Sequence, residues 1–440
     1  MIKLEKWFPD GMKKEYLAKI LKKVEEKNIG SSYLTYLRTD KKAYLIKIED
    51  LLTQPLSELM QMYSGLKLYI YLCGLEQYKN MTARKIMDTL VSCDLAVIKT
   101  DDDVYELPGY GRIEFSGKTL RKRDDLIKKE DFELIRRFLI EKIQQYDKLY
   151  YYHVVTLNPD YDKSKELFAK AIDSIRAELD QSLLSKSAGT ASAKGGYDSM
   201  GYIIHYSMLD NSLRHKLLRS LGVTTCPYCN RQFITGYIDE NHQEKTTADL
   251  DHFYQKGIYP LFALSLFNFI PSCQICNSRM KGEKQIHSLY PYYEGFKDKV
   301  KFCLVPSKKD DDKALLRAWL GDRQASDDIR IDLKLSEELE PSYAKRAEGS
   351  IALFKLKQIY AIHKEKALDT IRKKRIYWES PYKQFMEDLF KRIGLAFSEE
   401  DILAFLVGYH WQDQNYDEPL SKFVHDIFYS DETEPDDLSE

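Results

Sequence analysis

Two Cys-x-x-Cys pairs constrain this chain more than any other feature of its sequence. Cys226-Pro-Tyr-Cys229 and Cys273-Gln-Ile-Cys276 have the same internal spacing, and residues 230–272 lie between them. Four thiolates are the tetrahedral ligand set of closed, structural zinc sites, which leave no position open for chemistry. Two unrelated reduced pairs are the alternative, and a redox pair would not need a second copy. The spacing predicts one structural Zn²⁺ that joins the two ends of an insertion.

The composition indicates a globular protein without an overall surplus of positive charge. The chain has 440 residues, of which 43% are hydrophobic and 31% charged, and its formal net charge is -2. This length predicts two or three domains, and any phosphate-binding surface has to concentrate its cations locally. The first residues lack the apolar core of a signal peptide, and no apolar run reaches membrane-spanning length. We therefore expect a cytoplasmic protein that does not contact a membrane.

Hydrophobic periodicity divides the chain into helical flanks and a central region with little helical periodicity. In the C-terminal flank, for example, apolar residues from Leu353 to Ile371 repeat at helical spacing, with His363 on the same face as a packed core histidine. The predicted fold class is mainly α with a small central α+β domain. The expected organisation is a helical N-terminal region (1–184), a flexible linker or loop (185–196), a central domain (197–302), a helical C-terminal region (303–430) and a disordered acidic tail (431–440).

A winged-helix-like unit is one interpretation of residues 82–107. Thr82 can cap a helix, and Leu95–Lys99 and Val104–Leu107 read as two strands around an Asp-rich turn. A generic α+β packing unit is the simpler explanation of the same outline. The sequence leaves both interpretations open.

The central region carries polar residues of the kinds that perform chemistry. Phe233–Ile238 reads as a strand, Asp239–Gln243 as a polar turn, and a second strand is expected to end at Leu250. The candidate residues come directly after that strand and around the second cysteine pair: Asp251, His252, Asn268 and Asn277.

This order of motifs resembles the zinc-knuckled branch of the HNH (ββα-metal) endonuclease superfamily. The resemblance covers residues 226–293 and rests on the cysteine pairs, on Leu250-Asp251-His252-Phe253, and on an Asn before and after the second pair. Residues 287–293 and a Lys-rich helix beyond them are similar, more loosely, to HNH proteins of bacterial antiphage systems, including the nuclease partners of Septu-like and retron-linked ATPases. The resemblance implies a ββα-metal fold and a metal-dependent endonuclease, with DNA favoured over RNA as its substrate.

The same resemblance implies a setting in bacterial antiviral defence, with an ATPase or sensor protein as a partner. The chain itself has no Gly-x-x-x-x-Gly-Lys-Ser/Thr stretch for binding ATP. The partner's identity, the trigger and the oligomeric state stay open at this point.

The family pattern assigns a role to each candidate residue. His252 is the general base that takes a proton from water, Asp251 and Asn277 are ligands of a catalytic Mg²⁺ or Mn²⁺, and Asn268 braces the hairpin and orients the base. Phosphodiester hydrolysis asks for the same residue types, because it needs a base of near-neutral pKa and a hard cation with oxygen ligands. Asn277 stands where many family members have His, and an amide oxygen suits Mg²⁺ or Mn²⁺ better than Zn²⁺.

Five further residues are weaker candidates. Asp249 either assists metal binding or faces solvent. Arg279, Lys281 and Lys284 hold flanking phosphates of a nucleic acid or are ordinary surface cations. His287 is expected to be structural.

Two other function classes fit parts of the sequence. One is a zinc-stabilised module that binds nucleic acid or protein without cleaving it, and the other is a helical interaction protein with a degenerate insert. A pure binder has no need of an adjacent acid and imidazole, so Asp251 and His252 favour the enzyme. The sequence does not discriminate DNA from RNA, or single from double strands.

Overall fold

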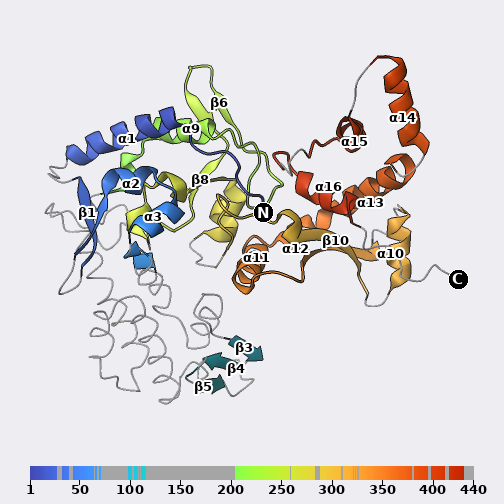
Figure 1. The fold of residues 1–440 in the computed structure, drawn as a ribbon, viewed down its shortest axis with the longest axis horizontal. Helices are drawn as coiled ribbons and strands as arrows, with labels where there is room; N and C mark the ends of the chain where they lie inside the picture. The colour runs from blue at the N-terminus through green and yellow to red at the C-terminus, as the bar shows by residue number, and fades with distance from the viewer. Residues whose placement is uncertain are drawn as a thin grey trace.

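The computed structural model of the protein describes most of residues 1–70, the strands between residues 98 and 114, and most of residues 204–430 (Figure 1). The described ranges are 1–26, 32–38, 43–63, 65–66, 69–70, 98–101, 104–107, 109, 111–114, 204–257, 259–282, 288–308, 311–320, 322, 324, 327–378, 381–394, 398–411 and 416–430. The helix expected after Thr82, the linker at 185–196 and the acidic tail at 431–440 lie outside them. Within these ranges, no helix combines the length and the apolar character needed to cross a membrane.

The described fold is a mixed α/β arrangement in which about half of the residues are helical and the sheets are small. The sequence predicts a helical C-terminal region, whereas the structure also holds the antiparallel pair β10 (Val300–Pro306) and β11 (Ile329–Leu335) there. The difference has a simple origin, because Ile329, Ile331 and Leu333 are buried and alternate with more exposed polar residues. That is the two-residue period of a strand rather than a helical one.

The N-terminal elements pack against the central region. They are α1 (Asp10–Glu25), the hairpin of β1 (Tyr33–Arg38) and β2 (Ala43–Lys47), α2 (Ile48–Thr53) and α3 (Leu56–Met62). The Tyr16 hydroxyl on α1 donates to the Leu264 carbonyl at 2.5 Å, and the Leu261 N–H donates to the Tyr69 hydroxyl at 3.0 Å. Both bonds hold residues 261–264. The Ala263 carbonyl in this segment contacts His252.

A three-stranded antiparallel sheet occupies residues 98–114. The predicted strand Val104–Leu107 is confirmed as β4, and its partner β3 (Ile98–Asp101) extends past the predicted end at Lys99 to include Asp101, which the sequence places in the turn. The strand β5 (Gly111–Glu114) was not predicted. The winged-helix interpretation depends on a helix outside the described residues, so it stays a prediction.

The central region is built from short elements. They are η4 (Tyr206–Met208), α9 (Asn211–Ser220), β6 (Gly236–Ile238), β7 (Glu244–Thr246), β8 (Asp249–His252), η5 (Pro260–Phe262), η6 (Leu266–Asn268), β9 (Phe269–Ser272) and the π-helix η7 (Ile275–Lys281). The hairpin β6–β7 lies against α9, and a Cβ on Gly236 would approach the Cβ of Arg219 to 2.8 Å. Glycine at position 236 therefore allows this close contact.

The strands β8 and β9 form an antiparallel pair, and η7 follows directly. The register places Asp251 opposite Ile270 and His252 opposite Phe269. The sequence predicts that this strand ends at Leu250, but β8 continues through His252 because both residues still have partners on β9. The candidate acid and base therefore lie inside a paired strand.

The rest of the C-terminal region is helical, and several of its helices pack on β10 and β11 (Figure 1). The helices are η8 (Lys297–Lys299), α10 (Asp312–Trp319), α11 (Pro341–Leu353), α12 (Leu356–Tyr360), η10 (Ala361–His363), α13 (Lys364–Lys373), η11 (Lys374–Trp378), α14 (Pro381–Arg392), α15 (Glu399–Val407) and α16 (Ser421–Phe428). The single helix predicted from Leu353 to Ile371 is divided into several pieces, and Lys355 between α11 and α12 has a left-handed φ of 47°. Such a residue cannot continue a right-handed helix.

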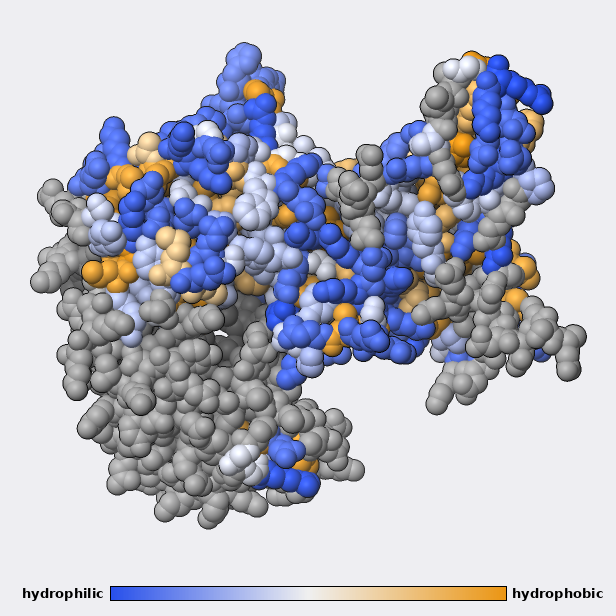
Figure 2. Space-filling view, in the orientation of Figure 1, coloured by the Kyte–Doolittle hydropathy of each residue, from blue (hydrophilic) through white to orange (hydrophobic). Residues whose placement is uncertain are grey.

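Hydrophilic side chains cover much of the described surface in Figure 2, with apolar side chains interspersed. On α14, Phe385 and Leu389 are exposed. The main core, by contrast, runs continuously through the N-terminal, central and C-terminal regions. These regions thus share one hydrophobic core around the cysteine pairs.

Candidate active site and cysteine cluster

The two cysteine pairs meet in one buried cluster. The Sγ atoms of Cys226, Cys229, Cys273 and Cys276 all lie within 4.8 Å of one another, and sulfurs bound to one tetrahedral zinc lie roughly 3.8 Å apart. Burial raises the pKa of the Cys226 thiol, because a thiolate in the interior loses its solvation. A cation among the four sulfurs would offset that cost. The donor set, its spacing and its burial are therefore consistent with the predicted zinc site.

A tyrosine links the first cysteine pair to the candidate acid. The Tyr228 hydroxyl, between Cys226 and Cys229, donates to Asp251 Oδ2 at 2.6 Å. Burial, and to a lesser degree the Asp251 carboxylate, raises the pKa of Tyr228 well above 10, so the hydroxyl keeps its proton. Its ring stacks on Phe354 with centroids 4.4 Å apart. The first cysteine loop, residues 226–230, thereby fixes one oxygen of Asp251.

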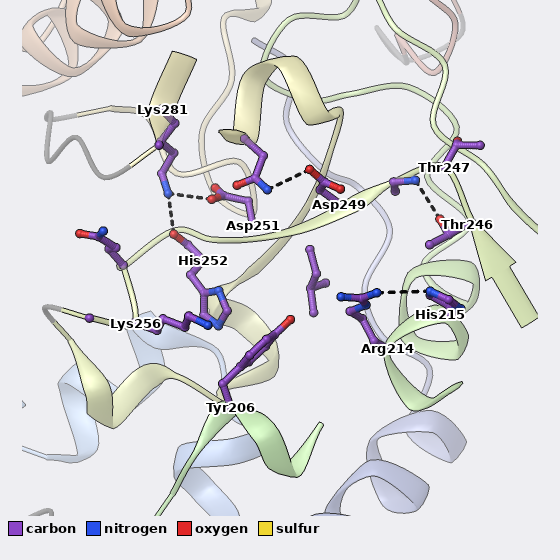
Figure 3. A pocket seen from close by; sticks show the side chains of 16 residues that line it. Tyr206, Arg214, His215, Thr246, Thr247, Asp249, Asp251, His252, Lys256 and Lys281 are labelled. Carbon is purple, nitrogen blue, oxygen red and sulfur yellow. Dashed lines mark hydrogen bonds and ion pairs between the residues drawn. The ribbon is translucent and has the colours of Figure 1, made fainter. Parts of the chain in front are cut away.

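An open cavity of about 670 Å³ lies over β8 (Figure 3). Asp249 and Asp251, two residues apart on the strand, both line it, as expected for one side of an extended segment. Asn277 and Lys281, four residues apart on η7, line it as well, and so does His252. The structure therefore brings the predicted acid, base and amide together at one cavity.

Lys281 differs from its prediction. Its ammonium forms an ion pair with Asp251 Oδ1 at 2.8 Å and donates to the His252 carbonyl at 2.6 Å, and the residue is only 6% exposed. A surface lysine that meets flanking phosphates would be exposed. The buried carboxylate of Asp251 explains the difference, because an interior charge requires a partner.

The His252 ring is held in one orientation. Its Nε2 lies 3.0 Å from the Ala263 carbonyl, and a carbonyl oxygen only accepts, so Nε2 carries the proton. In the neutral ring the basic lone pair is then on Nδ1. The ring packs edge-on against Tyr206 at 4.9 Å and Phe269 at 5.2 Å. This tautomer is the one that a general base at Nδ1 requires.

Asn268 fastens the segment between β8 and β9. Its Oδ1 accepts from the Tyr254 N–H at 2.7 Å, and its Nδ2 donates to the carbonyls of Tyr254 and Phe262, both at 2.9 Å. The side chain is fully buried, and its bonds join the start of the segment to the residue before Ala263. Bonds of this kind are what the expected bracing role requires.

Asn277 and Asp249 are paired with each other. Asn277 Nδ2 donates to Asp249 Oδ2 at 3.0 Å, which orients the amide and leaves its Oδ1 as the atom suited to a cation. Asp249 is half-buried beside the candidate ligands.

Of the other basic candidates, the structure describes only Arg279. Arg279 is exposed and lies outside the described lining. Lys284 and His287 fall outside the described residues, so nothing in the structure tests them.

Several residues that line the cavity were not predicted from the sequence. Tyr206, Arg214 and His215 precede the first cysteine pair, and Lys256 follows β8. Only the packing of α9 on the β6–β7 hairpin places Arg214 and His215 here, and no local sequence pattern signals that packing. For Lys256, which extends over the Tyr206 ring at 4.2 Å from its centroid, the short distance from His252 in the sequence was the one available signal.

Comparison of the chain with protein-family models, with curated proteins and with solved structures finds no match.

Proposed function

We propose that this protein is a metal-dependent endonuclease of the HNH type, which hydrolyses phosphodiester bonds in nucleic acid. The observation that carries the proposal is the meeting of Asp251, His252 and Asn277 at one open cavity, on two antiparallel strands followed by a helix. Strand, strand and helix in this order is the arrangement that the ββα-metal resemblance implies. The tautomer of His252 adds support, because its basic nitrogen is not the one bonded to Ala263.

The cavity offers oxygen donors to a hard divalent cation. Asp251, Asn277 Oδ1 and Asp249 lie on β8 and η7, and oxygen ligands of this kind suit Mg²⁺ or Mn²⁺. When bound, such an ion would neutralise charge on the phosphate and the leaving oxygen. The buried thiols, by contrast, form a closed set that suits a structural Zn²⁺.

His252 accepts the proton of the attacking water at Nδ1 in this proposal. The Ala263 carbonyl holds the opposite nitrogen, and Asn268 holds the residue before Ala263. These contacts therefore hold the His252 ring in a fixed orientation. Tyr228 and Lys281 fix the two oxygens of Asp251.

A second function has one specific observation in its favour. Both oxygens of Asp251 already have partners, as they would in a purely structural carboxylate. A zinc-stabilised module that binds nucleic acid or protein without cleaving it is consistent with that pairing. Cleavage that depends on a divalent ion discriminates between the two functions.

The biological setting follows from the sequence resemblance alone. We propose bacterial antiviral defence, with DNA favoured over RNA as the substrate and an ATPase or sensor protein as the controlling partner.

The test is incubation of the purified chain with plasmid, single-stranded DNA and RNA, with Mg²⁺ or Mn²⁺ and with chelator. We expect cleavage that requires the ion, and a His252→Ala variant that loses about 10²- to 10⁴-fold in rate, the contribution typical of a general base. His410→Ala is the matched control, because His410 is exposed and is not among the residues that line the cavity. Full activity in a folded His252→Ala protein would contradict the mechanism.

A further inference from the structure

Helix α9 carries three cations, and one of them differs from the others. Lys216 pairs with Glu15 at 2.5 Å and Arg219 pairs with Glu244 at 2.7 Å. Arg214 lines the cavity, and among the described residues no carboxylate forms an ion pair with it. The helix thus directs its one unneutralised guanidinium toward the candidate site.

A neighbouring imidazole orients that guanidinium. His215 Nδ1 lies 2.7 Å from the Glu244 carbonyl on β7, so Nδ1 carries the proton and Nε2 is the acceptor. Arg214 Nη2 lies 3.5 Å from that Nε2. The β6–β7 hairpin therefore fixes His215, and His215 limits the positions that Arg214 can take.

The cavity separates its acids from its base. In Figure 3, β8 crosses the cavity with Asp249 and Asp251 on one side of the strand, and with the His252 ring, Tyr206 and Arg214 on the other. Among the described lining residues, the charged ones are two aspartates and the cations Arg214, Lys256 and Lys281. An anion on the His252 side of the strand would meet the Arg214 guanidinium on the same side as the base.

We infer that Arg214 binds a backbone phosphate of the nucleic-acid strand, and that His215 is a positioning residue for this guanidinium. The ligand is a phosphodiester anion, which a planar guanidinium can contact through two parallel N–H donors. The inference rests on the proposed function and deepens it by naming how the cavity holds its substrate.

The experiment measures binding of fluorescein-labelled single-stranded and duplex DNA to the full chain by fluorescence anisotropy, at several salt concentrations. His252→Ala serves as the background in every sample, so that cleavage does not interfere. Arg214→Ala should raise the Kd about tenfold and reduce the slope of log K against log salt by about 1, the effect of losing one phosphate contact. His215→Ala should raise the Kd by a smaller factor with an unchanged slope, because the Arg214 guanidinium keeps its positive charge in this variant.

Arg219→Ala is the matched control, because it removes a cation from the same helix that is already paired with Glu244. Arg214→Lys should keep the slope and weaken binding a few-fold, so it replaces Arg214→Ala if that variant does not fold. Binding by Arg214→Ala that equals the Arg219→Ala control in both Kd and slope overturns the inference, as does the absence of any DNA binding at low salt. If the wild-type chain binds DNA through Arg214 but cleaves nothing, the phosphate site stands and the nuclease proposal fails.

Discussion

At the scale of single residues, Asp251 is a candidate ligand whose two oxygens both have partners. It is 4% exposed, with Tyr228 on one oxygen and Lys281 on the other. A buried carboxylate without partners would be strongly unfavourable, so these two contacts stabilise it in the interior. A metal ion bound to Asp251 would neutralise the same carboxylate as the Lys281 ammonium does. The two cations should therefore compete for Asp251.

Replacement of Lys281 by Met tests that competition. The variant removes the internal counter-ion, so we expect Mn²⁺ to bind about tenfold more tightly, since breaking a buried ion pair leaves a charge that costs on the order of 3 kcal/mol. Titration calorimetry or the Mn²⁺ electron paramagnetic resonance signal measures the affinity. Arg279→Met is the control, because Arg279 is exposed on the same helix. Equal affinities in the two variants would show that Lys281 does not compete for the site.

At the scale of elements, the first cysteine loop and the β8–β9–η7 unit are joined into one structural unit. Cys273 directly follows β9, Cys276 lies in η7, and Tyr228 joins the other cysteine pair to β8. The cluster should therefore determine whether the hairpin and the helix stay together.

Substitution of Cys273 by Ser tests this dependence. The purified wild-type chain should contain about one zinc, and Cys273→Ser should lose it together with on the order of 4 kcal/mol of unfolding free energy, in the range of the largest single-residue effects. Elemental analysis and denaturant unfolding measure the two quantities. Cys303→Ser is the control, because Cys303 is also buried but lies outside the cluster. A well-folded wild-type protein without zinc would contradict the prediction.

The sequence could predict those elements whose signal is local. The cysteine spacing indicated the cluster, and the polar turn at Asp239–Gln243 is confirmed between β6 and β7. The end of β8 was wrong by two residues because the partners of Asp251 and His252 lie on β9, far along the chain. The π-helical form of η7, with the Gly282 N–H bonded to the Asn277 carbonyl, depends on the same long-range packing.

The polar contacts of the site were harder to predict than its backbone. That Asp251, His252 and Asn277 share a cavity was expected, yet the ion pair of Lys281 with Asp251 was not. An ion pair of this kind depends on side-chain burial, which one sequence does not show. The place of Arg214 in the lining depends likewise on how α9 packs.

At the scale of the whole molecule, the first cysteine loop is a meeting point for distant parts of the chain. The Ile2 N–H donates to the Pro227 carbonyl, and the Tyr360 hydroxyl donates to the Cys229 carbonyl. Asn230, in a left-handed conformation with φ of 50°, donates to the Tyr416 and Glu418 carbonyls at 3.0 Å. The loop thus binds the N-terminal segment and the C-terminal helices at once.

A further long-range contact, made by Arg231 directly after this loop, should make stability depend on pH. Arg231 Nε donates to His363 Nε2 at 3.1 Å, and burial, with a smaller effect of Arg231, lowers the pKa of His363 to about 4. The ordinary pKa of His is about 6.5, so between about pH 6.5 and 4 the unfolded chain binds a proton that the folded chain does not. The free energy of unfolding should therefore fall as the pH falls through this window.

His363→Gln removes the titrating group and keeps an acceptor for Arg231. Its unfolding free energy should change less between pH 7 and pH 5 than that of the wild type, as measured by denaturant unfolding at the two values. His410→Gln, at an exposed position, should behave like the wild type. Parallel losses in all three proteins would assign the acid sensitivity to other groups.

The bonds of Asn230 also set an order of events during synthesis. Its side chain accepts from the Lys422 N–H and donates to carbonyls at residues 416 and 418, so these contacts cannot form until that part of the chain has been made and has emerged from the ribosome. Contacts between residues this far apart form late and slowly. A nascent chain therefore carries the Asp251–His252 strand without the Asn230 contacts of its first cysteine loop until residues 416–422 have emerged from the ribosome.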